Sequence, residues 1–513
     1  MSKTKSFFKS GIMLTIVGLG MRTVGMMFSA YVSRSVGAEG MGLYTLIMTV
    51  YSFALTLATS GISLTVTRLV ASAIGEGRIS DISRILRGSF IYALIFGSLA
   101  TLGLVFGADI IGGDVLSDDR TVSSLRVLAA SLIPAALSGV LTGYFVGVKR
   151  VGYNAASVIF SQVARIFLTV ALINLMLPFG FVAAVVGLCI GITITEILCF
   201  LLIFFEFLYF RHKNWQKTEK SKPDLSSVAA TALPLGFSAY VRSFLLNVEH
   251  ILIPQKLRES GESPSEAYSH YGTLHGMALP LVTYPMSPLS SFAGLLVPEF
   301  AEDMSAGRND RMSRVASRAL NLTLSYSVIS AVFIFAFAEE LGYVIYRSYD
   351  AGYYISTLSF VVPIMYLDHV TDSMLKGIGE QVFSMWVNIT DSLLSVLLVW
   401  LLIPRMGIMG YAVVIVIMEG YNFLLSFIRL RRKVDFSLSL IKYALIPLAV
   451  SLIATHLTGL IFLFGGSTSS PVWLATKMLF ALSITVFVLS LLNVKEGIFC
   501  TKSKREKYKQ QSV

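Results

Sequence analysis

The stretch GIMLTIVGLGMRTVGMMFSAYVS, residues 11–33, carries one charged side chain, that of Arg22, near its middle. The stretch is long enough to cross a bilayer as a single helix. A charged side chain near the centre of a membrane costs at least about 2.5–3.5 kcal/mol on insertion scales, so such residues usually face a polar interior. The stretch therefore predicts a membrane-spanning helix, and Arg22 predicts a polar site inside the protein.

The composition places the whole chain in the same class. Of 513 residues, 55% are hydrophobic and only 14% are charged, whereas soluble domains are about 25% charged. The net charge of +11 indicates no nucleic-acid partner, because the inside loops of membrane proteins are rich in Lys and Arg. The three cysteines have no metal-binding spacing, and no nucleophile-elbow, zinc-protease or P-loop motif occurs. We therefore expect a polytopic membrane protein that is not an enzyme and has no metal site.

Apolar segments follow one another along the chain, and their length fits helices rather than barrel strands. We expect an all-α membrane protein with fourteen transmembrane helices. The segments cover residues 11–33, 41–67, 88–112, 122–146, 152–176, 180–208, 227–253, 269–297, 318–345, 353–375, 382–403, 409–428, 438–461 and 472–493.

The loops between the segments differ in charge. With both termini cytoplasmic, basic loops such as RHKNWQKTEKSKPD at residues 211–224 fall inside. The acidic loop GGDVLSDDR at residues 112–120 then falls outside. The positive-inside rule therefore predicts that both termini are cytoplasmic.

Two inside loops resemble each other, and they predict an internal repeat. RLVASAIGEGRISDISRILR at residues 68–87 aligns with PEFAEDMSAGRNDRMSRVASR at residues 298–318, so that the Gly-Arg pairs at 77–78 and 307–308 coincide. The alternative is that loops between helices simply share Gly and Arg. With six spans in each half, the repeat would be parallel, about an axis normal to the membrane.

The repeat gives the expected domain organisation. We expect an N-terminal six-helix lobe at 1–210, a basic cytoplasmic linker at 211–225, a C-terminal six-helix lobe at 226–433, and two extra helices with a basic cytoplasmic tail at 434–513.

Arginine recurs inside the predicted spans. With an allowance for a longer loop in the second half, Arg22 aligns with Arg242, and Arg165 is also central in its segment. A guanidinium group binds phosphate through paired hydrogen bonds and stays charged at physiological pH. We therefore expect Arg22, Arg165 and Arg242 to bind an anionic head group in a cavity. The alternative for each is an interhelical ion pair or a contact with backbone carbonyls.

Carboxylates and small polar residues gather in two predicted spans of the second half. They are Asn247 and Glu249 in one span and Asn388, Thr390 and Asp391 in the other. Oxygen-rich sites of this kind suit a coupling cation or a proton, so we expect Na+ or H+ to bind there. The alternative is that the polar residues merely join helices.

The eighth segment contains MALPLVTYPMSPLSS at residues 277–291, with Pro280, Pro285 and Pro288. Proline removes a backbone donor and kinks a helix. We expect these prolines to permit bending during alternating access, and a static kink is the alternative.

Several motifs carry a resemblance to a known family. They are RTVG at 22–25, SRSVGAEGMGLYTLI at 33–47, LVASAIGEGR at 69–78, ILIPQKLRESGESPSEAYSHYGTLHGMALPL at 251–281 and LLVPEFAED at 295–303. With these motifs the chain resembles the polysaccharide-transporter branch of the multidrug/oligosaccharidyl-lipid/polysaccharide (MOP) exporter superfamily, which is related to the lipid II flippases. The likeness is greatest to sporulation proteins of that branch and covers nearly the whole chain.

The resemblance implies two six-helix lobes around a central cavity and an undecaprenyl-pyrophosphate-linked saccharide as substrate. Lipid II flippases of this superfamily have cavity arginines in the first, second and eighth spans. Arg22 matches the first of them. The second span here has no arginine, and the eighth has only His270 and His275. The pattern therefore departs from that of a strict lipid II flippase.

Together these features predict a flippase that moves a lipid-linked oligosaccharide or peptidoglycan precursor from the inner to the outer leaflet of the bacterial cytoplasmic membrane. The lipid bilayer and cell-wall synthesis enzymes are the expected partners. One alternative is a cation-coupled multidrug antiporter. The other is a non-transporting membrane scaffold for cell-wall or spore-cortex assembly.

Overall fold

The computed structural model describes the backbone of residues 2–59, 61–76, 78, 80–148, 150–214, 224–462 and 470–510. Side chains are described between residues 23 and 492 of these ranges, apart from residues 151, 154, 155, 212–214, 235 and 238. The side chain of Arg22, most of the predicted basic linker and the side chains of the basic tail therefore lie outside the described residues.

Every regular element in the described ranges is helical, so the predicted all-α class is confirmed. The chain is apolar enough to lie in lipid, where a helix satisfies its own backbone polar groups. The first helices are α1 (Ser2–Thr59), α2 (Ile62–Gly75), α3 (Asp81–Asp109), α4 (Val122–Ala129), α5 (Leu132–Gly147), α6 (Val151–Met176), α7 (Phe181–Asn214), α8 (Leu225–Glu259) and α9 (Pro264–Tyr271).

The remaining elements include several short helices and turns of π-helix. The α-helices are α10 (Leu279–Val282), α11 (Met286–Ser305), α12 (Asn309–Ala336), α13 (Ala338–Leu341), α14 (Tyr349–Ser359), α15 (Val362–Gly377), α16 (Gln381–Met406), α17 (Ile408–Lys433), α18 (Ile446–Ile461) and α19 (Pro471–Gln510). The π-helical turns are Ile110–Val115, Gly272–Ala278, Gly342–Tyr346 and Ile441–Leu445.

The predicted count of fourteen spans is not confirmed. Within the described ranges, nine helices are long and apolar enough to cross a membrane, or eleven if each of two bent helix pairs is one span. The expected span 11–33 and most of the expected span 41–67 lie in one helix, α1, which is interrupted at Gly37, and the end of the second span lies in α2. The φ of Gly37 is 75°, a left-handed conformation that glycine adopts at little cost. The expected spans 269–297 and 353–375 are each divided into shorter helices.

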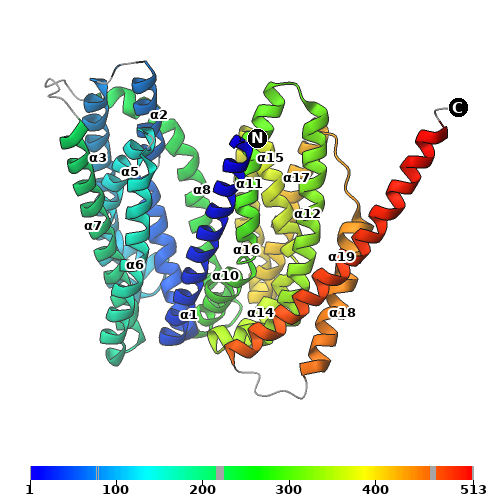
Figure 1. The fold of residues 1–513 in the computed structure, drawn as a ribbon. Coiled ribbons are helices and arrows are strands. Elements are labelled where there is room, and N and C mark those ends of the chain that lie inside the picture. The colour runs from blue at the N-terminus through cyan, green and yellow to red at the C-terminus, as the bar shows by residue number, and fades with distance from the viewer. Residues whose placement is uncertain are drawn as a thin grey trace. The chain divides into compact units, whose positions relative to one another are not determined.

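Residues 31–272 and 388–414 form one compact unit. Within it α6 lies along α7, and α5 packs against α2 and α3 (Figure 1). The contact of α5 with α2 depends on Gly143, because a Cβ atom there would lie 2.4 Å from the backbone oxygen of Ser63. Small residues at such positions let helix backbones approach closely in membranes.

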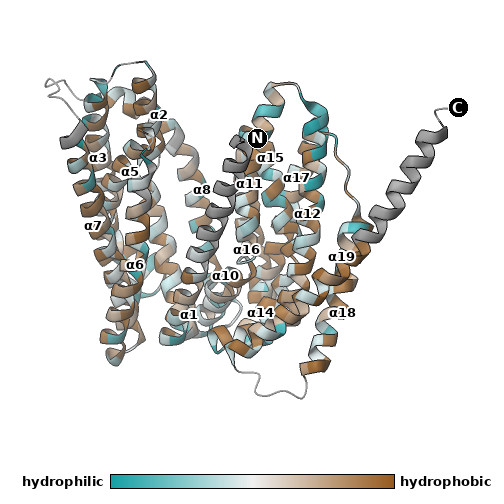
Figure 2. Cartoon of the chain, in the orientation of Figure 1, coloured by the Kyte–Doolittle hydropathy of each residue, from teal (hydrophilic) through white to brown (hydrophobic). Residues whose placement is uncertain are grey.

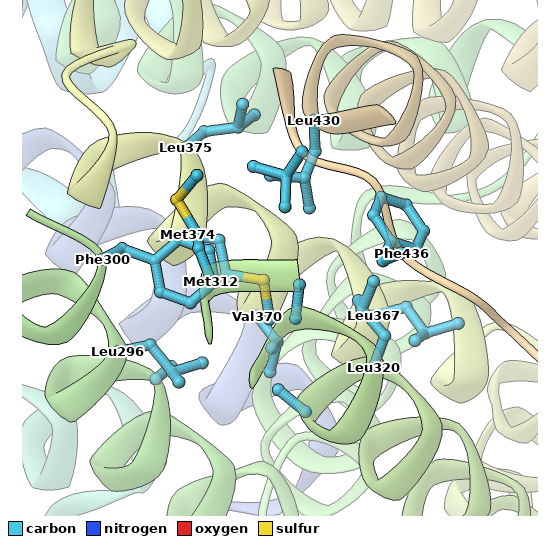
Figure 3. Packing of buried hydrophobic residues seen from close by; sticks show 14 of the residues in the cluster. Leu296, Phe300, Met312, Leu320, Leu367, Val370, Met374, Leu375, Leu430 and Phe436 are labelled. Atoms are coloured by element: carbon cyan, nitrogen blue, oxygen red, sulfur yellow. The ribbon is translucent and has the colours of Figure 1, made fainter. Parts of the chain in front are cut away.

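Residues 1–30, 273–387 and 415–513 form the other compact unit. Its hydrophobic core lies among α11, α12 and α15 and is closed by the end of α17 and the segment after it. Phe300, Met312, Met374, Leu430 and Phe436 meet there (Figure 3). The extra helix α18 packs against α12 and α19. The lobe boundaries predicted from the repeat stay a prediction.

Hydropathy varies along the helices in the way that a membrane protein requires. Hydrophobic colour predominates along α6 and α7, whereas hydrophilic colour gathers at the upper end of α12 (Figure 2). That end carries the basic sequence NDRMSRVASR at residues 309–318. Charged helix ends of this kind are expected where a chain leaves the bilayer.

A polar network ties the acidic loop at residues 112–120 to other parts of its unit. The Arg120 guanidinium contacts Glu39 and Asp118, each at 2.7 Å. The Ser265 hydroxyl donates a hydrogen bond of 2.7 Å to Glu39. The network therefore joins α1, this loop and α9.

Candidate functional site

A cavity of about 510 Å³ lies within the unit that contains the first thirty residues. One wall is α1 directly after Arg22, and the other is the chain from the π-helical turn Gly272–Ala278 to the break after α10. The Thr23 and Tyr284 hydroxyl oxygens, 2.6 Å apart, join the two walls. Small-molecule sites typically occupy about 300–1,000 Å³, so the cavity is large enough for a ligand group. Its lining residues are Gly25, Met26, Ser29, His275, Leu279, Pro280, Thr283 and Tyr284.

The wall opposite α1 is broken where the sequence is rich in proline. Pro280 is the second residue of α10, Pro285 directly precedes α11, and Pro288 is its third residue. Proline is tolerated in the first turn of a helix but not in its interior, so these prolines favour short helices that begin anew. The break leaves Thr283 and Tyr284 on the cavity wall. The gating role of the three prolines stays a prediction.

The three arginines predicted to bind a head group have different surroundings. Arg22 belongs to the unit with the cavity and precedes its wall, but its side chain lies outside the described residues. Arg165 and Arg242 belong to the other unit. Arg165 forms an ion pair of 2.7 Å with Glu196, between α6 and α7, whereas Arg242 on α8 is exposed. The ion pair accounts for Arg165 without a ligand, and the three substrate-binding roles stay predictions.

Two of the predicted ion-coupling residues share one site. Glu249 of α8 is only 7% exposed. It forms a hydrogen bond with Ser395 of α16 and interacts electrostatically with Asp391, one helical turn before Ser395. Two carboxylates this close cannot both be ionised cheaply, unless a proton or a cation lies between them. The site therefore has the charge that a coupling ion would need.

Two tyrosines interact with the Glu249 carboxyl group, and Asn247 precedes Glu249 by two residues on α8. Tyr271 and Tyr411, 0% and 4% exposed, both interact electrostatically with Glu249. The Asn247 amide nitrogen donates to the backbone oxygen of Ser243 at 2.7 Å. The amide oxygen of Asn247 is buried and accepts no hydrogen bond from the described residues. Oxygen atoms of these types are the ligands that hard cations prefer.

The other two predicted ion-coupling residues differ in their position on α16. Asn388 precedes Asp391 by three residues and shares its side of the helix, whereas Thr390 is adjacent to Asp391 and is rotated from it by about 100°. Among the described residues, no group of three or more His, Cys, Asp and Glu side chains could hold a metal ion. The ion-coupling roles of all five residues stay predictions.

Sequence reasoning missed Ser395, Tyr271 and Tyr284. Ser395 could have been found, because it lies four residues after Asp391 and therefore shares its face of a helix. Tyr271 and Tyr284 could not be found by spacing, because the chain between them contains a π-helical turn and a helix break. Periodicity does not predict which side chains such a segment turns inward.

Comparisons with known proteins agree with the motifs. The family model described as polysaccharide biosynthesis protein matches residues 7–304, and the MatE model matches residues 276–401. Stage V sporulation protein B of Bacillus subtilis (strain 168) is 27% identical over 419 residues, which cover 80% of this chain and 81% of that protein. Sporulation protein YkvU of the same organism is 21% identical over 361 residues, which cover 69% and 78% respectively.

Solved structures show the same fold. The lipid II flippase MurJ, in its inward closed conformation, matches with a TM-score of 0.73 and 14% identity over 95% of this chain and all of that one. An inward-facing multidrug resistance MATE family transporter of the MOP superfamily matches with a TM-score of 0.66 and 16% identity, over 82% and 98% of the two chains. Both of those proteins are transport proteins, and at identities of 14% and 16% the likeness shows a shared fold.

The family model, the fold and the composition agree with one another. One family model covers more than half of the chain, the solved structures share its helical fold, and its many apolar helices make it a multi-pass membrane protein. The resemblance predicted from the motifs is confirmed, and the chain belongs to the polysaccharide biosynthesis protein family.

Proposed function

We propose that the chain is a flippase that moves an undecaprenyl-pyrophosphate-linked oligosaccharide or peptidoglycan precursor from the inner to the outer leaflet by alternating access. One observation carries the proposal, namely the cavity between α1 and the break after α10. It lies directly after Arg22 in sequence, and hydroxyl groups and a histidine line it. The relatives supply the transport context, since MurJ is a lipid II flippase.

The chemistry of the cavity suits a phosphorylated head group. In this proposal the Arg22 guanidinium binds the pyrophosphate, because its planar donors match two phosphate oxygens. The facing wall carries the Thr283 hydroxyl, which donates to the backbone oxygen of Leu279, and the Tyr284 hydroxyl, which is bonded to that of Thr23. Arg22 would therefore be the main contact of the pyrophosphate in this proposal.

The carboxyl groups of Glu249 and Asp391 form the binding site of the coupling ion in this proposal. Binding of Na+ or H+ would relieve the repulsion between them. A ligand shifts a conformational equilibrium only by its differential affinity for the two states. The bound ion would therefore favour the conformation in which the pair is compact.

The orientation follows from the distribution of basic residues. In this proposal the protein lies in the bacterial cytoplasmic membrane with both termini inside. Substrate then enters from the leaflet where lipid-linked precursors are made, and cell-wall synthesis enzymes act on the product outside.

The test is a reconstituted flipping assay. Purified protein in vesicles is given a fluorescent lipid-linked precursor, and accessibility of the label is followed with and without Na+ and proton gradients. We expect wild type to flip and Arg22→Ala to be at least about tenfold slower, which is about 1.4 kcal/mol. Arg126→Ala is the matched control, because Arg126 forms an ion pair with Asp109 whose two side chains are exposed.

Two results would contradict the proposal. Equal flipping by wild type and Arg22→Ala would remove the role of Arg22. An absence of flipping by wild type under every gradient would favour the scaffold alternative.

A second candidate function is a cation-coupled multidrug antiporter. The close carboxylates Glu249 and Asp391 and the match to the MatE model favour it. Efflux of a cationic dye from the same vesicles distinguishes the two. Dye efflux without precursor flipping would replace the flippase assignment by the antiporter.

A further inference from the structure

A second cavity, of about 440 Å³, lies at the basic end of α12, and we call it the basic cavity. Three arginines and one carboxylate line it, so its net charge is positive. Its wall comes from α12 on one side and from the end of α17 with the following segment on the other. The lining residues are Ser313, Arg314, Ser317, Arg318, Arg431, Asp435, Phe436 and Ser437.

Hydrogen bonds hold the two walls of the basic cavity together. The segment after α17 is extended, and its Ser437 amide donates to the Ser317 hydroxyl at 3.0 Å. The Asn321 amide donates to the backbone oxygen of Ser437 at 2.9 Å. Arg431 donates to the backbone oxygen of Phe436, and its guanidinium lies 5.0 Å from the centre of the Phe436 ring. These hydrogen bonds therefore fix the non-helical segment after α17 against α12.

The arginines of the basic cavity differ from the cations beside it. Arg429 and Lys433 both contact Glu380, at 2.8 Å and 3.2 Å. In contrast, Arg314 and Arg318 form no ion pair with any carboxylate in the described part of the chain. Both are exposed, so their charge is available to a ligand. An anion is the ligand that this arrangement favours.

An apolar cavity of about 350 Å³ lies further along the same helix. Its first residue on α12 is Val328, ten residues after Arg318. At 1.5 Å per residue the separation is about 15 Å, which is about half the hydrocarbon thickness of a bilayer. The lining residues are Val328, Ala331, Val332, Phe335, Ser359, Phe360, Pro363, Ala444, Leu445, Leu448 and Leu452.

We propose that these two cavities form one binding site for an anionic glycerophospholipid. The phosphate lies in the basic cavity, and one acyl chain runs along α12 into the apolar cavity. Basic pockets at the cytoplasmic side of membrane helices attract anionic head groups, and guanidinium groups bind phosphate oxygens in pairs. The apolar cavity begins about one leaflet's depth from Arg318 along α12. The site lies apart from the residues assigned to flipping, so it does not rest on the proposed function.

The test measures lipid selectivity with the full-length protein in phosphatidylcholine bilayers. Spin-labelled phosphatidylglycerol and spin-labelled phosphatidylcholine are compared by the fraction immobilised at the protein. We expect wild type to prefer phosphatidylglycerol by at least about threefold, from the attraction of several cations. The variant Arg314→Gln/Arg318→Gln/Arg431→Gln should lose this preference. Arg432→Gln removes a neighbouring charge that does not line the cavity, and it should keep the preference.

Further variants separate the site from general charge attraction and from misfolding. Ala331→Phe fills the apolar cavity and should weaken the binding of phosphatidylglycerol without changing any charge. If the triple variant does not yield monodisperse protein, Arg318→Gln alone should show a smaller drop in the same ratio.

Several outcomes would overturn the proposal. Retained selectivity in a folded triple variant, or an equal loss in Arg432→Gln, would show attraction by the surface as a whole. Release of the immobilised lipid by excess inorganic phosphate would assign the basic cavity to free phosphate. Displacement by a lipid-linked precursor would assign it to substrate.

Discussion

Two pairs of ionisable residues in the same unit differ in the charges that they bring together. Arg165 and Glu196 bring a cation and a carboxylate together at 2.7 Å between α6 and α7. Glu249 and Asp391 bring two carboxyl groups together between α8 and α16. The first pair joins opposite charges, whereas the second joins two acidic groups, which a bound proton or cation would stabilise.

The difference indicates which charges are structural and which are functional. An opposite pair in a low-dielectric setting recovers part of the cost of desolvating its members. Two carboxylates side by side increase the cost of desolvation. If their role were purely structural, neutral residues would stabilise the protein more. We therefore propose a stabilising role for the Arg165–Glu196 pair and an ion-coupling role for the Glu249–Asp391 pair, and each proposal makes a separate prediction.

The largest expected effect is on coupling. Glu249→Gln with Asp391→Asn removes both acidic groups at nearly constant volume, so the response of flipping to an ion gradient should fall by at least about tenfold, equivalent to about 1.4 kcal/mol. The measurement is the flipping rate in vesicles with and without a Na+ or proton gradient. Arg165→Gln with Glu196→Gln is the control and should retain the response. A larger loss in this control than in the acidic double variant would reverse the two assignments.

The next effect is on stability. Arg165→Gln alone leaves Glu196 half-buried without its partner, and we expect a loss of about 1–3 kcal/mol, between the values for exposed and fully buried pairs. The double neutral variant should be less destabilised than either single variant, because it leaves no unmatched charge. Thermal unfolding in detergent micelles measures both. Additive losses in the double variant would mean that the two residues do not act as a pair.

A smaller effect is expected at the hydroxyl group beside the acidic pair. Ser395→Ala removes the hydrogen bond to Glu249 and leaves both carboxyl groups in place. One hydrogen bond to a carboxyl group contributes about 1 kcal/mol, so the apparent affinity for the coupling ion should change by about fivefold. The ion concentration that gives half-maximal flipping is the measurement. Ser392→Ala, one turn from Asn388 on the same helix, is the matched control.

The sequence predicted the helical class and the acidic pair for clear physical reasons. Long apolar segments have no alternative to helix in lipid. Glu249 and Asp391 were each conspicuous as carboxyl groups inside such segments. An interhelical ion pair was one alternative for Arg165, but its partner Glu196 was not predicted, because spacing along the chain does not show which helices are neighbours.

The span count could not be predicted from apolar length. Gly37 interrupts α1 without ending it, and residues 269–297 form the end of α9, a π-helical turn, the short helix α10 and the first part of α11 in place of one span. The cavity beside α1 depends on that break. Tertiary packing decides where a helix becomes irregular. Periodicity in the sequence therefore could not predict that the Thr283 and Tyr284 hydroxyl groups line the cavity.

The smallest expected effect is on the melting temperature, and it concerns a third charged pair that lies outside the predicted bilayer. Glu380 precedes α16 and contacts Arg429 at 2.8 Å, and the hydrogen bond from this guanidinium lowers the pKa of the Glu380 carboxyl group below its usual value. The unfolded chain therefore binds the proton more readily than the folded chain. The contribution of the pair to stability is present above the unfolded pKa of about 4.3, and it is lost as the pH falls through the lower folded pKa. Glu380→Gln should lower the melting temperature by less than about 2 °C at pH 7, since pairs in water contribute little. The difference from wild type should vanish in acid. A difference that grows below pH 4 would contradict the sign of this pKa shift.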